Sequence, residues 1–465
     1  MVTERFDAVV VGTGQGGGPL AGALAAAGRR TAIVERAEIG GTCINVGCTP
    51  TKTMVASARI AYLARRAADY GVETGSIAID MSRVRERKRA IVHDFRAGST
   101  ASLEKQDGLT LFRGDARFIA PKTLAVRMAN NEEQTLSTDL IVLNPGLRSA
   151  VSSLPGLETV DALDSTSIME LDHVPDHLLV LGGGYIGLEF GQMFRRFGAN
   201  VTIVQRGKRL LAREDTDIAD AIAAILREDG ITIHLESDAI AVALAGDAAI
   251  DLTIRMGTDE RHLSGSHLLV ATGRAPNTDA LNLAAGGIRT DGHGYVIADE
   301  HLATSAPDVY VIGDAKGGPA FTHIAYDDFR ILRANLIEGG RASIRNRQVP
   351  YTVFIDPQLG RIGLGEDEAK AQGRAIRVAR MPMASVARAI ETDETRGFMK
   401  VVVDAESDRI LGAAILGIEG GELMSMLQIA MLGNLPYTAL RDATFAHPTL
   451  AESFNNLFGQ LGNTS

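Results

Sequence analysis

Cysteine is almost absent from this sequence, since only two of its 465 residues are cysteines. Small extracellular domains that depend on disulfides for their stability are short and rich in cysteine. At roughly one domain per 150 residues, this chain is long enough for about three domains with buried cores of their own. The scarcity of cysteine therefore excludes a disulfide-stapled scaffold, and the two cysteines need another explanation.

Long apolar runs and an excess of positive charge are also missing. No uninterrupted apolar stretch approaches the roughly 18 residues that a membrane-spanning helix needs. The first residues, MVTERFDAVVV, lack the basic segment, apolar core and cleavage site of a signal peptide. The formal net charge of -10 argues against nucleic acid as the main partner. We therefore expect a cytoplasmic protein that binds neither membranes nor nucleic acid.

Glycine, by contrast, is concentrated in two turns that resemble each other. The apolar segment 6–11 is followed by GTGQGG, by an alanine-rich stretch predicted to be helical, and by a second strand that ends at Glu35. In such a pattern the glycines let the backbone approach a pyrophosphate, and the acid about 20 residues further on binds a ribose hydroxyl. The pattern predicts a first dinucleotide site that contains Gly12, Gly14, Gly17 and Glu35.

The pattern recurs at 177–205, where an apolar strand leads into GGGYIG, a helix and a further strand. Gln205 stands where the first pattern has its acid, and Arg206 follows directly. Because glutamine does not repel a 2′-phosphate, the second site is predicted to bind NAD(P)H and to favour NADPH. Solvent-exposed basic residues that leave NADH equally acceptable are the alternative. The predicted residues of this site are Gly182, Gly184, Tyr185, Ile186, Gly187, Gln205 and Arg206.

Each pattern closes with another apolar strand and a glycine turn, and two such sites in one chain indicate electron transfer between two cofactors. From about residue 346 the pattern changes. Segments 351–354 and 398–403 alternate like antiparallel strands, and 423–432 is predicted to be a helix. The expected fold is an α/β protein with two Rossmann-like dinucleotide-binding domains and a C-terminal α+β domain.

Both cysteines lie in the stretch GGTCINVGCTPTK. Zinc needs three or four ligands, and no nearby histidine or second cysteine pair completes such a set, so no metal site is predicted. In a regular helix the α-carbons of Cys43 and Cys48 would lie beyond the roughly 7 Å limit for a disulfide, so the backbone must bend, as Gly47 permits. Pro50 suits the first turn of a following helix, which places Cys48 at a helix start with Lys52 one turn on. These features favour a redox pair, with two inert buried thiols as the alternative.

GGTCINVGCTPTK, with GTGQGG before it and GGGYIGLE after it, resembles the flavoprotein pyridine nucleotide-disulfide reductases. This family includes dihydrolipoamide dehydrogenase, glutathione reductase and mercuric reductase. The stretch VYVIGDA at 309–315 is similar to the family's second flavin motif, and FAHPTLAE at 445–452 is similar to its carboxy-terminal catalytic motif. The resemblance spans nearly the whole chain, with the motifs in the expected order.

The resemblance implies that electrons pass from NAD(P)H through FAD to a Cys43–Cys48 disulfide. Cys48 would face the flavin, and Cys43 would exchange with the substrate. His447 would exchange a proton with Cys43 or the substrate, and Glu452 would orient it. In the family this histidine reaches the site from the other subunit, so a homodimer is implied. The substrate would be a small-molecule or protein disulfide.

The resemblance also implies further cofactor contacts. Lys52 and Glu189 match the family's ion pair beside the flavin and the nicotinamide. Gly273 belongs to the implied NAD(P) site. The other implied flavin contacts are Gly41, Thr42, Gly114, Ala116, Gly146, Arg274, Gly313 and Asp314.

Domain boundaries and the limits of the match follow from the same comparison with the family. It implies an FAD-binding domain at 1–150 that returns at 274–345, an NAD(P)-binding domain at 151–273, and a dimerisation domain at 346–465. The sequence resembles the mercuric reductase branch but lacks its additional carboxy-terminal cysteine pair, and Asn144-Pro145-Gly146 replaces the usual Ala-Thr-Gly. The rival hypothesis is a flavin-dependent NAD(P)H oxidoreductase that uses a quinone, oxygen or a metal ion without cysteine redox cycling.

Overall fold

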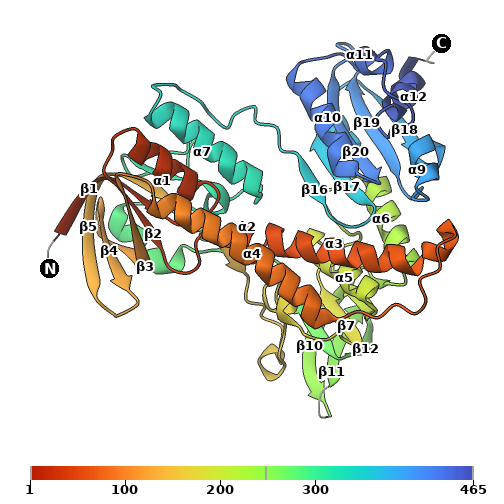
Figure 1. Ribbon diagram of the computed structural model, residues 1–465, viewed down its shortest axis with the longest axis horizontal. Coiled ribbons are helices and arrows are strands. Elements are labelled where there is room, and N and C mark those ends of the chain that lie inside the picture. Colours follow the sequence, from red (N-terminus) through yellow and green to blue (C-terminus); the bar gives the residue numbers. More distant parts are fainter. Residues whose placement is uncertain (1–2, 247–248, 463–465) are drawn as a thin grey trace. The chain divides into compact units, whose positions relative to one another are not determined.

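A computed structural model describes residues 3–246 and 249–462 of the chain (Figure 1). The chain divides into two compact units. The first comprises Met1–Met54, Arg83–Val151 and Gly273–Arg347, and the second comprises Val55–Ser82, Ser152–Thr272 and Gln348–Ser465. The division into FAD-binding, NAD(P)-binding and dimerisation domains stays a prediction.

The first unit is built on a six-stranded sheet of β1 (Thr3–Val11), β2 (Thr31–Glu35), β3 (Leu109–Ala120), β4 (Thr123–Met128), β5 (Glu133–Leu143) and β15 (Val309–Val311). Strands β3, β2, β1, β5 and β15 pair in this order and in parallel, while β4 pairs antiparallel with β3 and β5. Val9 lies between Ala32 on β2 and Ile141 on β5, and all three are fully buried. Such unbroken apolar runs are typical of parallel strands that are covered on both faces.

Two helices of the first unit pack together beside this sheet. Helix α1 (Gly17–Ala26) contacts β1, β2 and α7 (Thr322–Leu336) (Figure 1). Leu24 of α1 and Leu332 of α7 belong to the same buried cluster. Because α1 follows β1 and α7 follows β15, both helices begin at the edge of the sheet where the parallel strands end. The unit also contains α2 (Gly41–Asn45), the start of α3 (Cys48–Arg65), most of α4 (Met81–Glu104), and the paired strands β6 (Leu147–Ser149) and β14 (Arg274–Pro276).

The second unit repeats the strand, turn and helix pattern, as the sequence predicts. Its parallel sheet has the order β13 (His267–Val270), β7 (His177–Leu181), β8 (Asn200–Val204) and β9 (Thr232–His234). Helix α5 (Tyr185–Phe197) follows β7 and packs against β7 and β8. Helix α6 (Thr216–Glu228) and an antiparallel sheet of β10 (Ser237–Ala245), β11 (Ala249–Met256) and β12 (Asp259–Gly265) complete this region.

The carboxy-terminal part of the second unit is an antiparallel sheet with helices. The sheet has the order β16 (Tyr351–Val353), β17 (Gln358–Gly363), β20 (Ile410–Gly417), β19 (Phe398–Asp404) and β18 (Ile376–Pro382). The helices are α8 (Glu366–Ala371), α9 (Ala387–Glu391), α10 (Gly420–Leu432), α11 (Tyr437–Arg441) and α12 (Ser453–Gly459). None of the helices within the described ranges combines the length and the apolar character that a membrane crossing requires.

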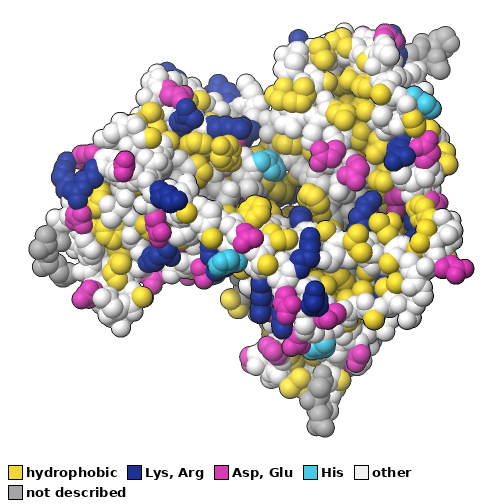
Figure 2. Space-filling model, in the orientation of Figure 1, with side chains coloured by type: hydrophobic (Ala, Val, Ile, Leu, Met, Phe, Trp, Pro, Cys, Tyr) yellow, Lys and Arg dark blue, Asp and Glu magenta, His cyan; other side chains and the backbone are white. Residues whose placement is uncertain are grey.

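The methionine-rich helix α10 is apolar on two sides. Leu423 and Leu427 are buried and belong to the core cluster of the antiparallel sheet. Met426, Ile429 and Leu432 are exposed, and Figure 2 shows hydrophobic side chains at the surface where α10 lies in Figure 1. One side of the helix therefore supplies core packing, and the other leaves an apolar surface uncovered within the described chain.

A buried lysine joins β19 to the starts of two helices. Lys400 is only 4% exposed, and its Nζ lies 3.0 Å from Asp215, 3.1 Å from Asp217 and 2.8 Å from Glu366. Asp215 precedes α6, Asp217 lies in its first turn, and Glu366 begins α8. Burial raises the pKa of Asp215, but hydrogen bonds from the Glu366 N–H and from Lys400 outweigh this and lower it overall. Hydrogen bonds from Lys370 and Lys400 lower the pKa of Glu366.

We expect Lys400→Met to lower the free energy of unfolding at neutral pH by about 3 kcal/mol, because it leaves partly buried carboxylates without their shared cation. Since the pKa values of Asp215 and Glu366 are lowered by folding, their contribution is complete above the unfolded value of about 4 and disappears as the pH falls through the folded values. The difference between wild type and variant should therefore shrink in acid. Chemical denaturation at neutral pH and at several pH values below about 4 measures it.

The matched control is Lys370→Met, which removes an exposed partner of the same Glu366. An exposed ion pair contributes little, so this variant should unfold like the wild type. Equal stability of Lys400→Met and Lys370→Met at neutral pH would contradict the prediction.

Candidate active site

The first glycine turn joins β1 to α1. Gly12 has a φ of +103°, and a Cβ on Gly17 would lie 2.1 Å from the Gly12 carbonyl oxygen, so neither position accepts a side chain without a shift. Glu35, at the end of β2, accepts hydrogen bonds from the Thr13 backbone N–H at 2.9 Å and from the Thr13 hydroxyl at 2.6 Å. A Cβ on Gly41 would lie 2.7 Å from the Gly14 α-carbon. The turn, the acid and the start of α2 are thus in close contact.

Asp314 lies at the same edge of the sheet, in a single 3-10 turn, Gly313–Lys316, directly after β15. Its carboxylate is 3.5 Å from Arg274. Burial raises the pKa of Asp314, and Arg274 opposes this rise. A partly desolvated carboxylate of this kind is suited to accept hydrogen bonds from ligand hydroxyl groups.

The turn that carries Asp314 is held by a buried acid that the sequence analysis did not single out. Asp328 of α7 is fully buried and accepts the Gly313 backbone N–H at 2.8 Å. It also pairs with Lys316 at 3.1 Å and with Arg347 at 2.6 Å. Two cations and one backbone N–H thus pair with this buried carboxylate, and through these contacts Asp328 fixes the position of the turn.

These features fit FAD. A glycine turn that side chains would block suits a pyrophosphate, and the partly buried Asp314 suits the hydroxyl groups of a ribityl chain. The other predicted flavin residues belong to the same unit: Gly41, Thr42, Lys52, Gly114, Ala116, Gly146, Arg274 and Gly313. All the predicted flavin residues therefore lie in the first unit, and their individual contacts with FAD stay a prediction.

Asn144, which replaces the family's usual alanine, fits because its neighbours are glycines. It is 8% exposed. A Cβ on Gly14 or Gly17 would lie 2.9 Å from its Nδ2, and a Cβ on Gly313 would lie 2.7 Å from its Oδ1. The departure from Ala-Thr-Gly is therefore compatible with the glycine turn, since the carboxamide occupies space that side chains at these three positions would need.

The second glycine turn has the same construction. Gly182 has a φ of +112°, and a Cβ on Gly187 would lie 2.1 Å from the Gly182 carbonyl oxygen. Gln205 Oε1 accepts the Gly183 backbone N–H at 2.8 Å, as Glu35 accepts that of Thr13 in the first turn. Gly184 precedes α5, and Tyr185 and Ile186 are the first residues of that helix. Arg206 is exposed beside the turn.

Glu189 of α5 is buried in the second unit and accepts the Phe354 backbone N–H at 2.8 Å. Lys52 lies in the first unit, so the ion pair between Lys52 and Glu189 stays a prediction. Gly273 directly precedes β14 and falls in the first unit, apart from the other predicted NAD(P) residues.

The cysteine pair lies where α2 ends and α3 begins. Cys43 belongs to α2, and Cys48 is the first residue of α3. The expected bend occurs between them, and a Cβ on Gly47 would lie 2.9 Å from the Thr42 carbonyl oxygen. The bend brings the Cys43 and Cys48 side chains into hydrogen-bonding contact as thiols. This contact, together with burial, raises the pKa of the Cys43 thiol, while Thr322 and Lys52 oppose the rise.

Thr322 also reaches the cysteines, although the sequence analysis missed it. Its hydroxyl oxygen lies 3.3 Å from Cys48 Sγ. Thr322 is the first residue of α7 and lies 274 positions from Cys48. No local spacing connects the two residues, so only the tertiary structure reveals the contact.

His447 and Glu452 form a pair in the second unit. His447 Nδ1 lies 3.0 Å and 2.9 Å from the two carboxylate oxygens of Glu452. An ionised carboxylate can only accept, so Nδ1 carries a proton and Nε2 is left for exchange. The imidazole side chain is 73% exposed, which leaves it accessible to a second molecule.

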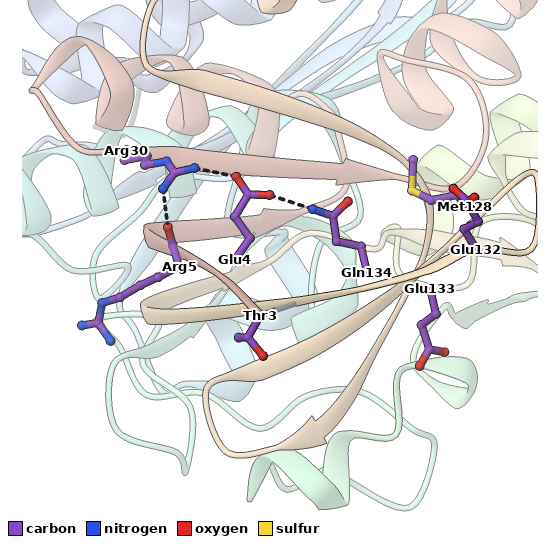
Figure 3. A pocket seen from close by; sticks show the side chains of 8 residues that line it. All are labelled: Thr3, Glu4, Arg5, Arg30, Met128, Glu132, Glu133 and Gln134. Atoms are coloured by element: carbon purple, nitrogen blue, oxygen red, sulfur yellow. Dashed lines mark hydrogen bonds and ion pairs between the residues drawn. The ribbon is translucent and has the colours of Figure 1, made fainter. Parts of the chain in front are cut away.

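A surface hollow in the first unit lies elsewhere (Figure 3). Its lining includes Thr3, Glu4 and Arg5 at the beginning of β1 and Gln134 at the beginning of β5. Arg30 and Gln134 donate hydrogen bonds to Glu4, so these polar groups satisfy one another (Figure 3). Ligands of open parallel sheets bind beyond the carboxyl ends of the strands, whereas this hollow is at the opposite end of β1.

Together, the two glycine turns and the paired thiols define an oxidoreductase that uses dinucleotides. Residues 6–328 match the family described as pyridine nucleotide-disulphide oxidoreductase, and residues 349–458 match the dimerisation domain of that family. The chain therefore belongs to the pyridine nucleotide-disulphide oxidoreductases. Membership implies FAD and a pyridine nucleotide as cofactors, and the dimerisation domain indicates a homodimer.

Relatives and solved structures agree with this assignment. The chain is 36% identical over 459 residues to the "Probable pyridine nucleotide-disulfide oxidoreductase RclA" of Escherichia coli K12, covering 98% of this chain and 99% of that protein. It is 34% identical over 449 residues to a mercuric reductase of Staphylococcus aureus, covering 96% and 81%. The Cu(II) complex of the HOCl-induced flavoprotein disulfide reductase RclA from Escherichia coli matches at a TM-score of 0.90 and 35% identity, over 98% and 100% of the two chains. The predicted fold class is confirmed.

Proposed function

We propose that this enzyme reduces a disulfide, or a related thiol-reactive substrate, with electrons from NAD(P)H that pass through FAD and the Cys43–Cys48 pair. The observation that carries the proposal is the contact between the Cys43 and Cys48 thiols at the start of α3. Both cysteines lie in the first unit, together with the predicted flavin-binding residues. FAD, when bound, takes a hydride from the nicotinamide and delivers two electrons to the cysteine disulfide.

The two cysteines have different roles in this proposal. Cys48, at the helix start, is the thiolate that faces the flavin. Cys43 keeps its proton more strongly, because its pKa is raised by the contact with Cys48 and by burial. Once deprotonated, Cys43 attacks the substrate disulfide and releases one thiol, and Cys48 then displaces the second thiol as the Cys43–Cys48 disulfide re-forms. NAD(P)H, one proton and the substrate disulfide thus give NAD(P)⁺ and two thiols.

His447 supplies the proton transfer in this scheme. Its Nδ1 is fixed by Glu452, so Nε2 accepts the proton of Cys43 and returns it to the departing thiol. We infer that His447 of each subunit of the homodimer completes the cysteine site of the other subunit. The exposed imidazole and the apolar surface of α10 support this arrangement.

The test is an anaerobic titration of the enzyme with NADPH. Reduction should produce the long-wavelength absorbance of a thiolate-to-flavin charge-transfer pair, and full reduction should take more than one hydride equivalent per flavin. A wild-type enzyme that takes up a single equivalent and shows no such band would not be a disulfide reductase of this kind.

NADPH is proposed as the preferred coenzyme because Gln205 carries no charge and Arg206 is exposed beside the second turn. We expect Arg206→Glu to raise the KM for NADPH by about tenfold and to leave the KM for NADH nearly unchanged, since only NADPH presents a 2′-phosphate. Steady-state kinetics with both coenzymes measure this. Arg255→Glu, the same change at an exposed position of β11, is the control. Equal effects on both coenzymes would contradict the assignment.

A metal ion is the second candidate for the electron acceptor. The observation in its favour is that RclA of Escherichia coli has been solved as a Cu(II) complex, and another relative is a mercuric reductase. A panel of oxidised glutathione, lipoamide, other disulfides, quinones, Hg(II) and Cu(II) separates the candidates. Reduction of Cu(II) or quinones that persists in Cys48→Ser would favour an acceptor that bypasses the cysteines.

A further inference from the structure

We propose that the Thr322 hydroxyl is a positioning group of the redox pair, which donates a hydrogen bond to the Cys48 thiolate and thereby sets the pH at which this thiolate forms. The inference rests on the proposed redox role of Cys43 and Cys48. It adds a residue from α7 to the two cysteines, which both lie in the stretch GGTCINVGCTPTK.

The contact itself has the geometry of a hydrogen bond to sulfur. Thr322 Oγ1 lies 3.3 Å from Cys48 Sγ, and the same hydroxyl also interacts with the Cys43 side chain. A thiolate can only accept, so the hydroxyl must be the donor whenever Cys48 is charged. Thr322 therefore bonds Cys48 and also lowers the pKa of the Cys43 thiol, as expected of a donor that favours the charged form of its acceptor.

Two helix starts meet at this contact. Cys48 is the first residue of α3, which has 18 residues, and Thr322 is the first residue of α7, which has 15 residues. The first N–H groups of a helix lack partners within the helix, and its amino terminus carries a partial positive charge. The Cys48 sulfur thus belongs to the first residue of one helix and bonds the first residue of another, and the Thr322 hydroxyl is the directed donor to it.

Helix α7, which carries this hydroxyl, contacts both the turn at Gly313 and the first glycine turn. Asp328, two turns further along α7, is fully buried and accepts the Gly313 N–H and a hydrogen bond from Arg347. At Ala325, the carbonyl oxygen of α7 would lie only 2.7 Å from a Cβ on Gly16, so the helix backbone touches the first glycine turn. The first glycine turn, the turn that carries Asp314 and the Thr322 hydroxyl are therefore all in contact with or part of α7.

Other polar groups approach the pair from neighbouring elements. The positive charge of Lys52 on α3 lowers the pKa of the Cys43 thiol. Cys43 on α2 is itself a titratable neighbour of Cys48. His323 follows Thr322 on α7. Its ring stacks on the Phe321 ring, and the two ring centroids are 5.4 Å apart. These groups are unchanged when only the hydroxyl of Thr322 is removed, so a substitution at this position isolates its contribution.

The test uses the FAD-loaded enzyme and follows the charge-transfer absorbance of the two-electron-reduced form against pH. We expect Thr322→Val, which keeps the shape and removes the donor, to move the midpoint of this band upward by about one pH unit. Thr322→Ser should restore the wild-type midpoint. Thr53→Val, which removes a hydroxyl that bonds the Thr49 carbonyl oxygen within α3, should leave the midpoint unchanged.

A second readout does not depend on the flavin. After reduction with dithiothreitol, the rate of iodoacetamide modification of Cys48 against pH should show the same upward shift in Thr322→Val. Thr322→Ala provides another hydroxyl-free variant if the valine variant does not fold. An unshifted midpoint in a folded hydroxyl-free variant, with a normal band in the wild type, would overturn this inference alone. Absence of the band in the wild type would instead overturn the proposed function.

Discussion

Replacing Cys48 with serine is expected to abolish the charge-transfer absorbance and to lower kcat for disulfide reduction by on the order of 10³-fold or more. A serine hydroxyl is similar in size to the thiol, but it is not ionised at neutral pH and cannot form a disulfide with Cys43. Stopped-flow absorbance during NADPH reduction, followed by turnover with the best disulfide of the panel, measures both effects.

Cys43→Ser is the matched control for this prediction. It keeps the Cys48 thiolate at the start of α3, so the charge-transfer band should persist while disulfide turnover is lost. Both variants should retain FAD and accept a hydride from NADPH, because neither change alters a glycine turn. Disulfide turnover by Cys48→Ser at the wild-type rate would show that this cysteine does not carry the electrons.

Replacing His447 with glutamine is expected to slow disulfide turnover by about 10²- to 10⁴-fold, the usual contribution of a general acid or base. The variant would then lack a base to accept the proton of Cys43, because the imidazole that Glu452 orients is gone. Rapid-mixing experiments measure reoxidation of the two-electron-reduced enzyme by the substrate disulfide.

The reductive half-reaction is the internal control for His447→Gln, since flavin reduction by NADPH should proceed at the wild-type rate. Glu452→Gln should have a smaller effect, about tenfold, because the amide oxygen can still accept from His447 Nδ1 but no longer balances the charge of a protonated ring. If reoxidation of His447→Gln is as fast as that of the wild type, His447 is not the proton-transfer residue.

The parts of the fold that could be predicted are those written in consecutive residues. The turn that begins at Gly12, the strand that ends at Glu35 and the bend at Gly47 each follow from short-range patterns, and the structure shows all three features. The helix at 423–432 is found within α10. Such features need only local spacing and the conformational freedom of glycine.

The contacts that sequence reasoning missed join residues far apart in the chain. Thr322 is 274 positions from Cys48, and Lys400 is 185 positions from Asp215. A threonine at the start of a helix or a lysine within a strand is ordinary in isolation, and only packing gives it a partner. The suitability of Asn144 could not be predicted either, because it depends on three glycines from two separate turns that converge on its side chain.

Glu35 and Gln205 occupy equivalent positions beside the two glycine turns. In both turns a single side-chain oxygen closes the loop by accepting one backbone N–H, at 2.9 Å from Glu35 and 2.8 Å from Gln205. An amide and a carboxylate perform this structural task equally well, whereas only the carboxylate repels a phosphate on the ribose. We therefore expect an exchange of amide for carboxylate at position 205 to change the coenzyme preference while the architecture of the turn remains unchanged.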